Sequence, residues 1–378
     1  MRADIDSALN KSESKSITEE NIAKCVRCGL CLGVCPLYLS EREEGFSPRG
    51  KIHTIDCSKE RAVIKKVLNN CLLCLSCRSV CPNGVNIPDA IKIFRRDKSI
   101  AGQIYFLLRT VQGKDFRRFR LICTLMEIDN RAGGFLKLMG MSRKIPEAGK
   151  EKIVYNNFLD EKSIGIFTGC ISSVFYPQII NHICKFYRSK GYSVYIPDSQ
   201  VCCGLMNSSA GDEPKALSLA LRNTELFSSE KIEKIITPCA SCAYMLRQYG
   251  KLVSGGEIIS RKIYPPDEMI SDFIQTASFG DLDALHIPCH IRNAEEKLFY
   301  NRLKNLKKVK IIDACCGYGG VFNLYEYEKS VKIGEKILKE IKGRKSVYTL
   351  CSGCYLHLYD VIRKNRIDTE VKSLFELI

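Results

Sequence analysis

The chain has 378 residues, 45% of them hydrophobic, which is enough for two or three domains with cores of their own. It holds 21 cysteines but only five histidines and no tryptophan, so we expect its metal chemistry to depend on thiolates. The net charge of +16 comes from scattered Lys and Arg without a nucleic-acid-binding motif, so we expect no nucleic acid partner.

The N-terminal stretch is polar and charged and lacks the apolar segment of a secretory signal. This argues against a secreted scaffold rich in disulfides. No run approaches the roughly 18–20 apolar residues of a membrane span, so we expect no transmembrane segment. We expect a reduced, oxygen-sensitive, anaerobic and cytoplasmic protein. Its basic surface suits an acidic redox partner, or peripheral association with the inner face of the cell membrane.

Residues 1–20 are rich in Ser, Glu and Lys and are expected to form a disordered tail. Residues 21–98 contain two runs of one pattern, Cys-x2-Cys-x2-Cys-x3-Cys-Pro, which begin at Cys25 and Cys71. This spacing wraps thiolates around cubane [4Fe–4S] clusters, and two runs are typical of a bacterial two-cluster ferredoxin module. A zinc site would use paired ligands and would not need the third and fourth cysteines of each run.

In such modules the fourth cysteine of each run commonly binds the cluster of the other run. We therefore assign Cys81 to the first cluster and Cys35 to the second. Arg49, between the runs, is expected to support a loop over a cluster, and a helix is expected from Ile87 to Arg96. The predicted ligands are Cys25, Cys28, Cys31 and Cys81 for cluster 1, and Cys71, Cys74, Cys77 and Cys35 for cluster 2.

Residues 99–160 are expected to form a helical linker. Apolar residues recur at i, i+3, i+4 and i+7 from Ile104, and basic residues follow. A helix lying on a membrane surface would combine these features. We favour a linker helix that packs on its neighbours and leaves a basic face in solvent.

The remainder consists of two copies of one unit, residues 161–263 and 264–378. Each copy has a strand before a single cysteine, then a Cys-Cys-Gly element, then a strand before Cys-x2-Cys. The Cys-Cys-Gly elements lie 113 residues apart (202 to 315) and the Cys-x2-Cys elements 112 apart (239 to 351), so the copies nearly keep register. We expect strands at Ile164–Thr168, Ile235–Thr237, Leu285–Ile287 and Val347–Leu350, and helices at Tyr176–Ser189, Pro214–Phe227 and Glu326–Ile341.

Short strands that alternate with helices predict an α/β unit with a parallel sheet in each copy. The expected fold is therefore α+β and multidomain, a helical ferredoxin-type 2×[4Fe–4S] module followed by two duplicated α/β domains. Because the cysteines follow strands or open loops, they should lie at the C-terminal edge of each sheet, where such folds bind cofactors. Five thiolates, two of them adjacent, suit a larger iron–sulfur assembly better than a tetrahedral ion.

Other cysteines and histidines carry weaker signals. Cys57, Cys123 and Cys184 lack partners at ligand spacing and are expected to pack as small buried groups. His290 and His357 lie close to candidate ligand cysteines. They either donate hydrogen bonds to cluster sulfur or are ordinary half-buried histidines.

The spacing C-x31-CC-x35-C-x2-C of the first copy resembles the cysteine-rich CCG domain of heterodisulfide reductases. The same domain occurs in the iron–sulfur subunits of glycolate oxidase and anaerobic glycerol-3-phosphate dehydrogenase. The whole layout is similar to the glycolate oxidase iron–sulfur subunit and to the D subunit of heterodisulfide reductase. The stretch Ser47–Ile52 is similar to a Pro-Arg-Gly-Arg-Ile stretch of the glycolate oxidase type, and Pro288–His290 resembles its Asp-Pro-Cys-His.

The resemblance implies one or two further [4Fe–4S] clusters at the CCG elements, noncubane in heterodisulfide reductases. Whether each copy binds a noncubane cluster, a cubane or zinc stays open. Copy two departs from copy one, because 25 residues separate Cys289 from Cys315, against 31 between Cys170 and Cys202. The implied ligands are Cys170, Cys202, Cys203, Cys239 and Cys242 in copy one, and Cys289, Cys315, Cys316, Cys351 and Cys354 in copy two.

No GxGxxG sequence opens a βαβ unit, so we expect no flavin or NAD here and a partner that carries out the substrate chemistry. One hypothesis is an iron–sulfur electron-transfer subunit. It would pass electrons between a flavoprotein dehydrogenase, acting on a 2-hydroxy acid of the glycolate or lactate type or on a polyol, and a quinone, a membrane haem subunit or another carrier. The alternative is a catalytic disulfide reductase of the heterodisulfide type that acts at a CCG-bound noncubane cluster. A scaffold with structural clusters is the third hypothesis.

Overall fold

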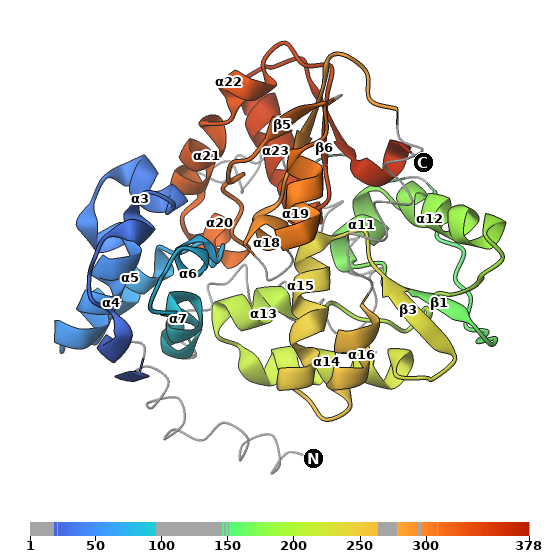
Figure 1. Cartoon of the computed structure of the whole chain (residues 1–378), viewed down its shortest axis with the longest axis horizontal. Helices are drawn as coiled ribbons and strands as arrows, with labels where there is room; N and C mark the ends of the chain where they lie inside the picture. The colour runs from blue at the N-terminus through green and yellow to red at the C-terminus, as the bar shows by residue number, and fades with distance from the viewer. Residues whose placement is uncertain are drawn as a thin grey trace, which may run out of the picture.

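The computed structural model describes residues 19–20, 22–95, 146, 149, 151–263, 278–293, 297–307 and 309–377. Most of the expected tail (1–20) and of the expected linker (99–160), together with Cys123, lies outside the described residues. A helical N-terminal module lies beside two α/β units, one formed by each copy (Figure 1). The expected fold class, a helical iron–sulfur module followed by two α/β domains, is confirmed.

The N-terminal module consists of short helices around the cysteine loops. Helix α4 begins where Ser47 accepts a hydrogen bond from the backbone N–H of Gly50 (2.8 Å), and Pro48 occupies its first turn. The module's core is a small set of buried aliphatic residues contributed largely by α4, α5 and α7. The helices are η1 (Leu30–Leu32), α3 (Pro36–Glu41), η2 (Glu44–Phe46), α4 (Pro48–Cys57), α5 (Arg61–Asn69), α6 (Ser76–Ser79) and α7 (Ile87–Arg95).

Copy one is a three-stranded parallel sheet of order β2-β1-β3 with helices packed around it. The central strand β1 is buried along its whole length, as expected for a parallel strand covered on both faces. Its elements are β1 (Ser163–Ile166), α11 (Cys170–Phe175), α12 (Gln178–Ser189), β2 (Ser193–Tyr195), α13 (Leu205–Ala210), α14 (Glu213–Phe227), β3 (Ile232–Ile236), α15 (Ala240–Gln248), η4 (Tyr249–Lys251) and α16 (Gly256–Lys262).

Copy two repeats this plan with one more strand, in the parallel order β5-β4-β6-β7. Strands β4 and β6 are fully buried, like β1. Its elements are β4 (Asp283–His286), α18 (Cys289–Arg292), α19 (Lys297–Lys304), β5 (Lys310–Ile312), α20 (Val321–Tyr325), α21 (Tyr327–Glu335), α22 (Leu338–Ile341), β6 (Ser346–Thr349), α23 (Ser352–Lys364), β7 (Glu370–Ser373) and η5 (Leu374–Leu377).

The structure differs from the sequence-based expectation in three places. Strands β2, β5 and β7 were not expected. The helix expected over Glu326–Ile341 divides into α21 and α22, because Lys336 and Ile337 bond to carbonyls three residues back instead of four. Residues 151–160, expected as the end of a helical linker, are not helical; Asn156 instead forms an antiparallel bridge with Ile196 beyond β2.

The two copies share one continuous hydrophobic core. A separate small cluster joins the N-terminal module to copy two, in which Leu37 and Leu72 of the module pack with Phe322 and Ile333. Helix α3 also contacts α21, and α7 contacts α13 of copy one. The module therefore packs against both α/β units, as Figure 1 shows at the inner ends of α6 and α7.

Candidate metal centres

Five thiols of the N-terminal module line one small cavity, here called cavity 1. The loop of the first cysteine run, which surrounds this cavity, adopts left-handed backbone conformations at Arg27 (φ 56°) and Gly29 (φ 88°). A Cβ on Gly29 would lie 2.8 Å from Nη1 of Arg49, so glycine leaves room for this guanidinium. Arg49 donates to the carbonyl oxygen of Arg27 (3.3 Å) and to Glu44, and so supports the loop. Four of the thiols are the set expected for cluster 1, those of Cys25, Cys28, Cys31 and Cys81, and the fifth is that of Cys77.

A second cavity, cavity 2, adjoins the first. Burial raises the pKa of Cys35 to about 11, while the positive charge of Lys51 acts in the opposite direction. Lys51 is only 2% exposed and donates to the carbonyl oxygen of Phe46. A buried ammonium group beside four thiols is the environment in which an anionic centre is stabilised. The thiols are those of Cys35, Cys71, Cys74 and Cys77.

The residues around both cavities suit an iron–sulfur cluster. All eight thiols are free of disulfides, and soft thiolate ligands favour iron–sulfur clusters. The chain turns through left-handed backbone at Leu73 (φ 52°) and Leu75 (φ 65°), and the N–H of Leu73 lies 3.4 Å from Sγ of Cys71. The structure thus brings together both thiol sets expected from the spacing, including the exchange of Cys35 and Cys81 between the runs. That they bind clusters stays a prediction.

The five cysteines of copy one converge at the C-terminal edge of its sheet. Hydrogen bonds from Cys170 and then Cys203 hold the pKa of Cys202 well below its usual value. Hydrogen bonds from Cys242 and from a thiol of copy two likewise lower the pKa of Cys239. The set therefore favours thiolate at two positions, which is the form that binds metal.

Buried polar side chains hold the Cys-Cys-Gly turn of copy one. Asn223 donates to the carbonyl oxygen of Cys202 (3.2 Å), and Tyr249 donates to that of Cys203 (2.9 Å). Gly204 has φ 86°, and its N–H lies 3.5 Å from Sγ of Cys202. The turn is thus fixed from its outer side, while its thiols face the sheet edge.

Copy two holds its own Cys-Cys-Gly turn with different residues. Ser330 donates to the carbonyl oxygen of Gly317 (2.7 Å), and a Cβ on Gly317 would lie 2.3 Å from the Ser330 carbonyl oxygen. His357 is buried and donates to that same oxygen (3.1 Å), so it supports the turn. Sγ of Cys316 lies 3.3 Å from Sγ of Cys354. The thiols of copy two are those of Cys289, Cys315, Cys316, Cys351 and Cys354.

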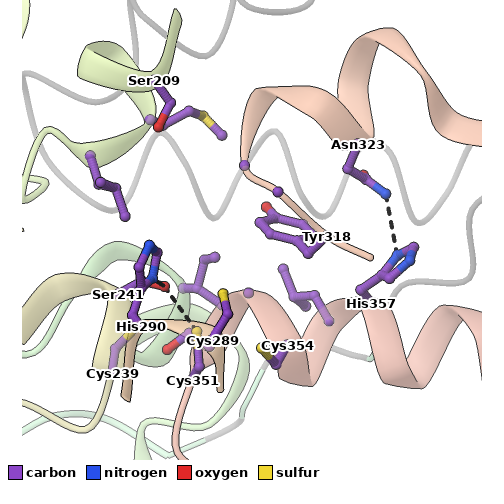
Figure 2. Close-up of a pocket in the computed structure, with 18 of the residues that line it drawn as sticks. Ser209, Cys239, Ser241, Cys289, His290, Tyr318, Asn323, Cys351, Cys354 and His357 are labelled. Atoms are coloured by element: carbon purple, nitrogen blue, oxygen red, sulfur yellow. Dashed lines mark hydrogen bonds between the residues drawn. The ribbon is translucent and has the colours of Figure 1, made fainter. Parts of the chain in front are cut away.

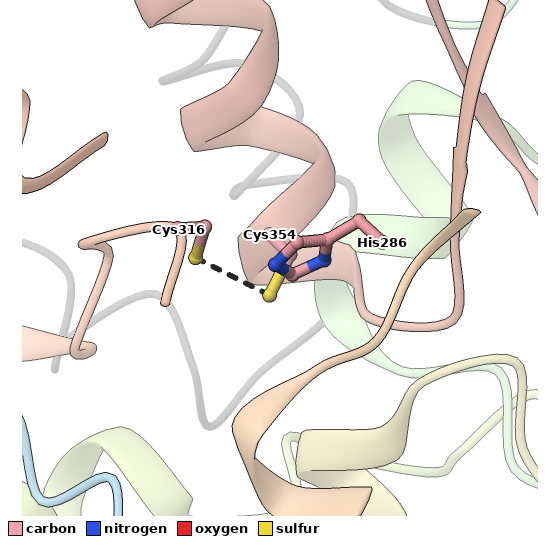
Figure 3. A group of neighbouring side chains, drawn as sticks. All are labelled: His286, Cys316 and Cys354. Atoms are coloured by element: carbon pink, nitrogen blue, oxygen red, sulfur yellow. Dashed lines mark hydrogen bonds between the residues drawn. The ribbon is translucent and has the colours of Figure 1, made fainter. Parts of the chain in front are cut away.

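A buried histidine that the sequence analysis missed lies beside the thiols of copy two (Figure 3). A ring nitrogen of His286 lies within 4.8 Å of Sγ of both Cys316 and Cys354. Its Nε2 lies 3.1 Å from the carbonyl oxygen of Ala314, which only accepts, so Nε2 carries the proton. Its Nδ1 lies 3.2 Å from Oγ1 of Thr349. Burial lowers the pKa of His286 to about 4, so the ring is neutral near pH 7.

The thiols of both copies line one shared cavity of about 230 Å³, here called the CCG cavity (Figure 2). The C-terminal edges of the two sheets face each other across it. The N–H of Ala240 donates to the carbonyl oxygen of Leu350 (2.8 Å), and Oγ of Ser172 lies 2.9 Å from that of Ser352. All ten cysteines implied by the resemblance are therefore brought together at one place.

Polar groups of both copies meet at this cavity (Figure 2). Oγ of Ser241 lies 3.0 Å from Sγ of Cys351 and 2.9 Å from Nδ1 of His290. The ring of His290 stacks on Tyr244 with centroids 4.7 Å apart, and burial lowers its pKa to about 4. His290 thus reaches a candidate ligand through Ser241, an indirect form of the hydrogen bond considered from the sequence.

The three cavities form a row. Cys77 lines cavities 1 and 2, and Cys74 lines cavity 2 and the CCG cavity. Burial first, and then the Cys74 thiol, raise the pKa of Cys289. Asn293 fixes this contact, because it donates to the carbonyl oxygen of Cys74 (2.7 Å) and to Oγ of Ser76 (2.8 Å). The N-terminal module therefore meets the CCG cavity at the thiols of copy two.

The spare cysteines behave differently from one another. Cys184 is buried in copy one, as expected. The expectation of burial is wrong for Cys57, which is exposed on the last turn of α4. That helix buries Ile52 and Ile55 on its other side, so the helical period directs Cys57 into solvent.

Two families match the chain: the 4Fe-4S dicluster domain over residues 21–85, and the cysteine-rich domain, CCG, over residues 164–247 and 284–359. The probable glycolate oxidase iron–sulfur subunit of Bacillus subtilis (strain 168) is 25% identical over 94% of this chain and 92% of its own length. The B subunit of the fumarate reductase (CoM/CoB) of Methanothermobacter marburgensis is 25% identical over 94% of this chain and 71% of its own. The glycolate oxidase iron–sulfur subunit of Escherichia coli (strain K12) is 21% identical over 97% of this chain and 96% of its own length.

Fold, thiol sets and matches together define an iron–sulfur protein with a 4Fe-4S dicluster domain followed by two cysteine-rich CCG domains. The resemblance predicted from the sequence, to the family of the glycolate oxidase iron–sulfur subunit and the D subunit of heterodisulfide reductase, is confirmed. Among the residues that the structure describes, none of the helices combines the length and the apolar composition needed to cross a membrane.

Proposed function

We propose that this chain is the electron-transfer subunit of an oxidoreductase complex. The observation that carries the proposal is the row of thiol-lined cavities, linked by Cys77 and then by Cys74. The row leads from Cys28, whose side chain is exposed, to the CCG cavity in the interior. Such an order is suited to moving single electrons between a partner at the surface and a buried site.

Iron–sulfur clusters, when bound, supply one-electron redox chemistry whose potential depends on nearby charge, hydrogen bonds and solvent exposure. The protein's own groups provide these influences unequally. Lys51 places a buried positive charge at cavity 2, whereas cavity 1 has the more exposed thiols. At the CCG cavity, Ser241 approaches Cys351 and buried thiols surround the space. The sites would therefore differ in potential, which gives the electron a direction.

We assign the substrate chemistry to a flavoprotein partner. The sequence has no dinucleotide-binding GxGxxG unit. Relatives that span almost the whole chain are named as iron–sulfur subunits of glycolate oxidase. By extension, we propose that the partner here oxidises a 2-hydroxy acid of the glycolate or lactate class, or a polyol. A quinone, a haem subunit or another carrier then takes the electrons at the inner face of the cell membrane.

Anaerobic reduction with a flavoprotein dehydrogenase that oxidises glycolate or lactate tests the proposal. Mixed with that flavoprotein and a hydroxy acid, the iron–sulfur holoprotein should lose its broad visible absorption, whereas either component alone should leave it unchanged. The variant Cys74→Ser, which should lose the cluster of cavity 2 between the other two sites, should slow reduction of the CCG site more than that of the cavity 1 site. Absence of any reduction with the complete mixture would refute the proposal.

A second function, disulfide reduction, is favoured by the CCG cavity itself. Ten thiols from two copies line about 230 Å³, beside Ser241 and His290. Cleavage of a disulfide there would take two electrons and two protons and release two thiols. If a disulfide added to oxidised holoprotein creates a new paramagnetic signal, this second function is favoured. If only the flavoprotein and a hydroxy acid give turnover, the electron-transfer function stands.

A further inference from the structure

We propose that His53, Asp56 and Cys57 form a surface site for zinc, or for another divalent ion of similar softness, at the end of α4. The three side chains are exposed, and their potential ligand atoms all lie within 4.8 Å of one another. Nothing in the proposed electron-transfer function uses them. The site would be additional to the iron–sulfur sites and beside the outermost of them.

The spacing of the three residues follows from the helix. Positions i, i+3 and i+4 lie on one face of an α-helix, so His53, Asp56 and Cys57 project to the same side of α4. Sγ of Cys57 lies 3.3 Å from Nδ1 of His53 and 3.9 Å from Oδ2 of Asp56. Tetrahedral zinc with ligand distances of about 2.0–2.3 Å separates its ligand atoms by roughly 3.5 Å. The three atoms therefore already have nearly the spacing that the ion requires, and water would complete the coordination.

The kind of ion follows from the donor set. Thiolate, imidazole and carboxylate are the three ligand types that zinc accepts, whereas magnesium and calcium select oxygen ligands. Arg27 donates to Oδ2 of Asp56 (3.0 Å) and so orients the carboxylate, as partners of metal ligands commonly do. Arg27 also lines cavity 1, between Cys25 and Cys28. An ion at this site would thus adjoin the loop that surrounds cavity 1.

Alkylation of Cys57 in the anaerobic holoprotein tests the site, with the labelled peptide quantified by mass spectrometry against buffered free zinc. Because only the unbound fraction reacts, labelling should slow about tenfold when free zinc is ten times its Kd. His53→Ala and Asp56→Asn should each need at least about tenfold more zinc for the same protection, since each removes a ligand. Asp198→Asn, which alters an exposed carboxylate on copy one, should be protected like the parent chain.

Each variant is compared with its own labelling rate without zinc, because His53 contacts the thiol directly. Iron is counted in the same samples. An unchanged labelling rate at every zinc concentration would overturn the proposal. Protection that persists fully in His53→Ala, or that appears only together with loss of iron, would overturn it as well.

Discussion

At the scale of single residues, the fourth cysteine of each N-terminal run lies with the first three of the other run: Cys81 at cavity 1 and Cys35 at cavity 2. We expect Cys81→Ser to leave the same residual EPR spectrum as Cys28→Ser, and Cys35→Ser the same as Cys74→Ser. Each change should remove about four iron atoms, the content of one cubane. Cys184→Ala, outside the cavities, should keep all its iron. A Cys81→Ser spectrum that matches Cys74→Ser would refute the exchange.

The buried charge of Lys51 gives a second prediction at this scale. Lys51→Met removes a positive charge beside Cys35 while keeping the apolar stem. A unit charge several ångströms away, at an effective dielectric constant near 20, contributes about 2 kcal/mol, so the potential of the cavity 2 centre should fall by roughly 50–100 mV. Redox titration followed by EPR measures this shift. Lys59→Met, an exposed lysine of the same module, should change it little; equal shifts in both variants would contradict the account.

At the scale of elements, Arg95 joins the end of α7 to two other segments. Arg95 is 1% exposed, and its guanidinium donates to the carbonyl oxygens of Leu68 (2.9 Å), Cys71 (2.9 Å) and Ser209 (3.0 Å). Arg95→Met leaves these buried acceptors unpaired, which should cost about 3 kcal/mol. The melting temperature of the anaerobic holoprotein should therefore fall by roughly 5–10 °C. The control Arg188→Met, at an exposed arginine, should change the melting temperature by little. Equal decreases in the two variants would show that Arg95 does not anchor α7 in this way.

The N-terminal module and the α/β units differ in how much core they bury. The module's own cluster contains seven buried residues, whereas the cluster shared by copies one and two extends through both sheets. Below about 70–80 residues, folds of this kind usually depend on a metal or a similar cross-link. Removing the clusters by chelation should therefore expose residues 22–95 to proteolysis while the α/β units stay resistant. Equal resistance of both parts would contradict a structural role for the clusters.

Strands β1, β3, β4 and β6 could be predicted from the sequence, although β3 lies at a sheet edge, because each contains a buried apolar run just before a cysteine element. The missed strands have a common cause. Strands β2, β5 and β7 all lie at the edge of a sheet. Edge strands bury fewer side chains, so β5 (Lys310–Ile312) and β7 (Glu370–Ser373) carry charged residues and lack a continuous apolar run. Helix ends moved by one or two residues, because capping geometry decides them.

The cysteine sets could be predicted because ligand spacing within a run is local. The contacts between cysteines of different runs, and between the module and the α/β units, could not be predicted. His286 is the last residue of the buried strand β4, where β1 ends in the apolar Ile166, and the sequence does not show that its ring reaches the thiols of copy two. Cys74 was expected at one centre, and its second contact, with the CCG cavity, depends on how the module packs on copy two. Such contacts are set by tertiary packing, which the spacing of one run does not encode.

At the scale of the whole molecule, the account requires iron at successive sites from the surface to the interior. The most direct measurement is metal analysis of anaerobically purified chain, with EPR during stepwise reduction. We expect about eight iron atoms from two cubanes, with further iron at the CCG cysteines, and clusters that take up electrons one at a time. Zinc, or no metal, at the eight cysteines of cavities 1 and 2 would contradict the account.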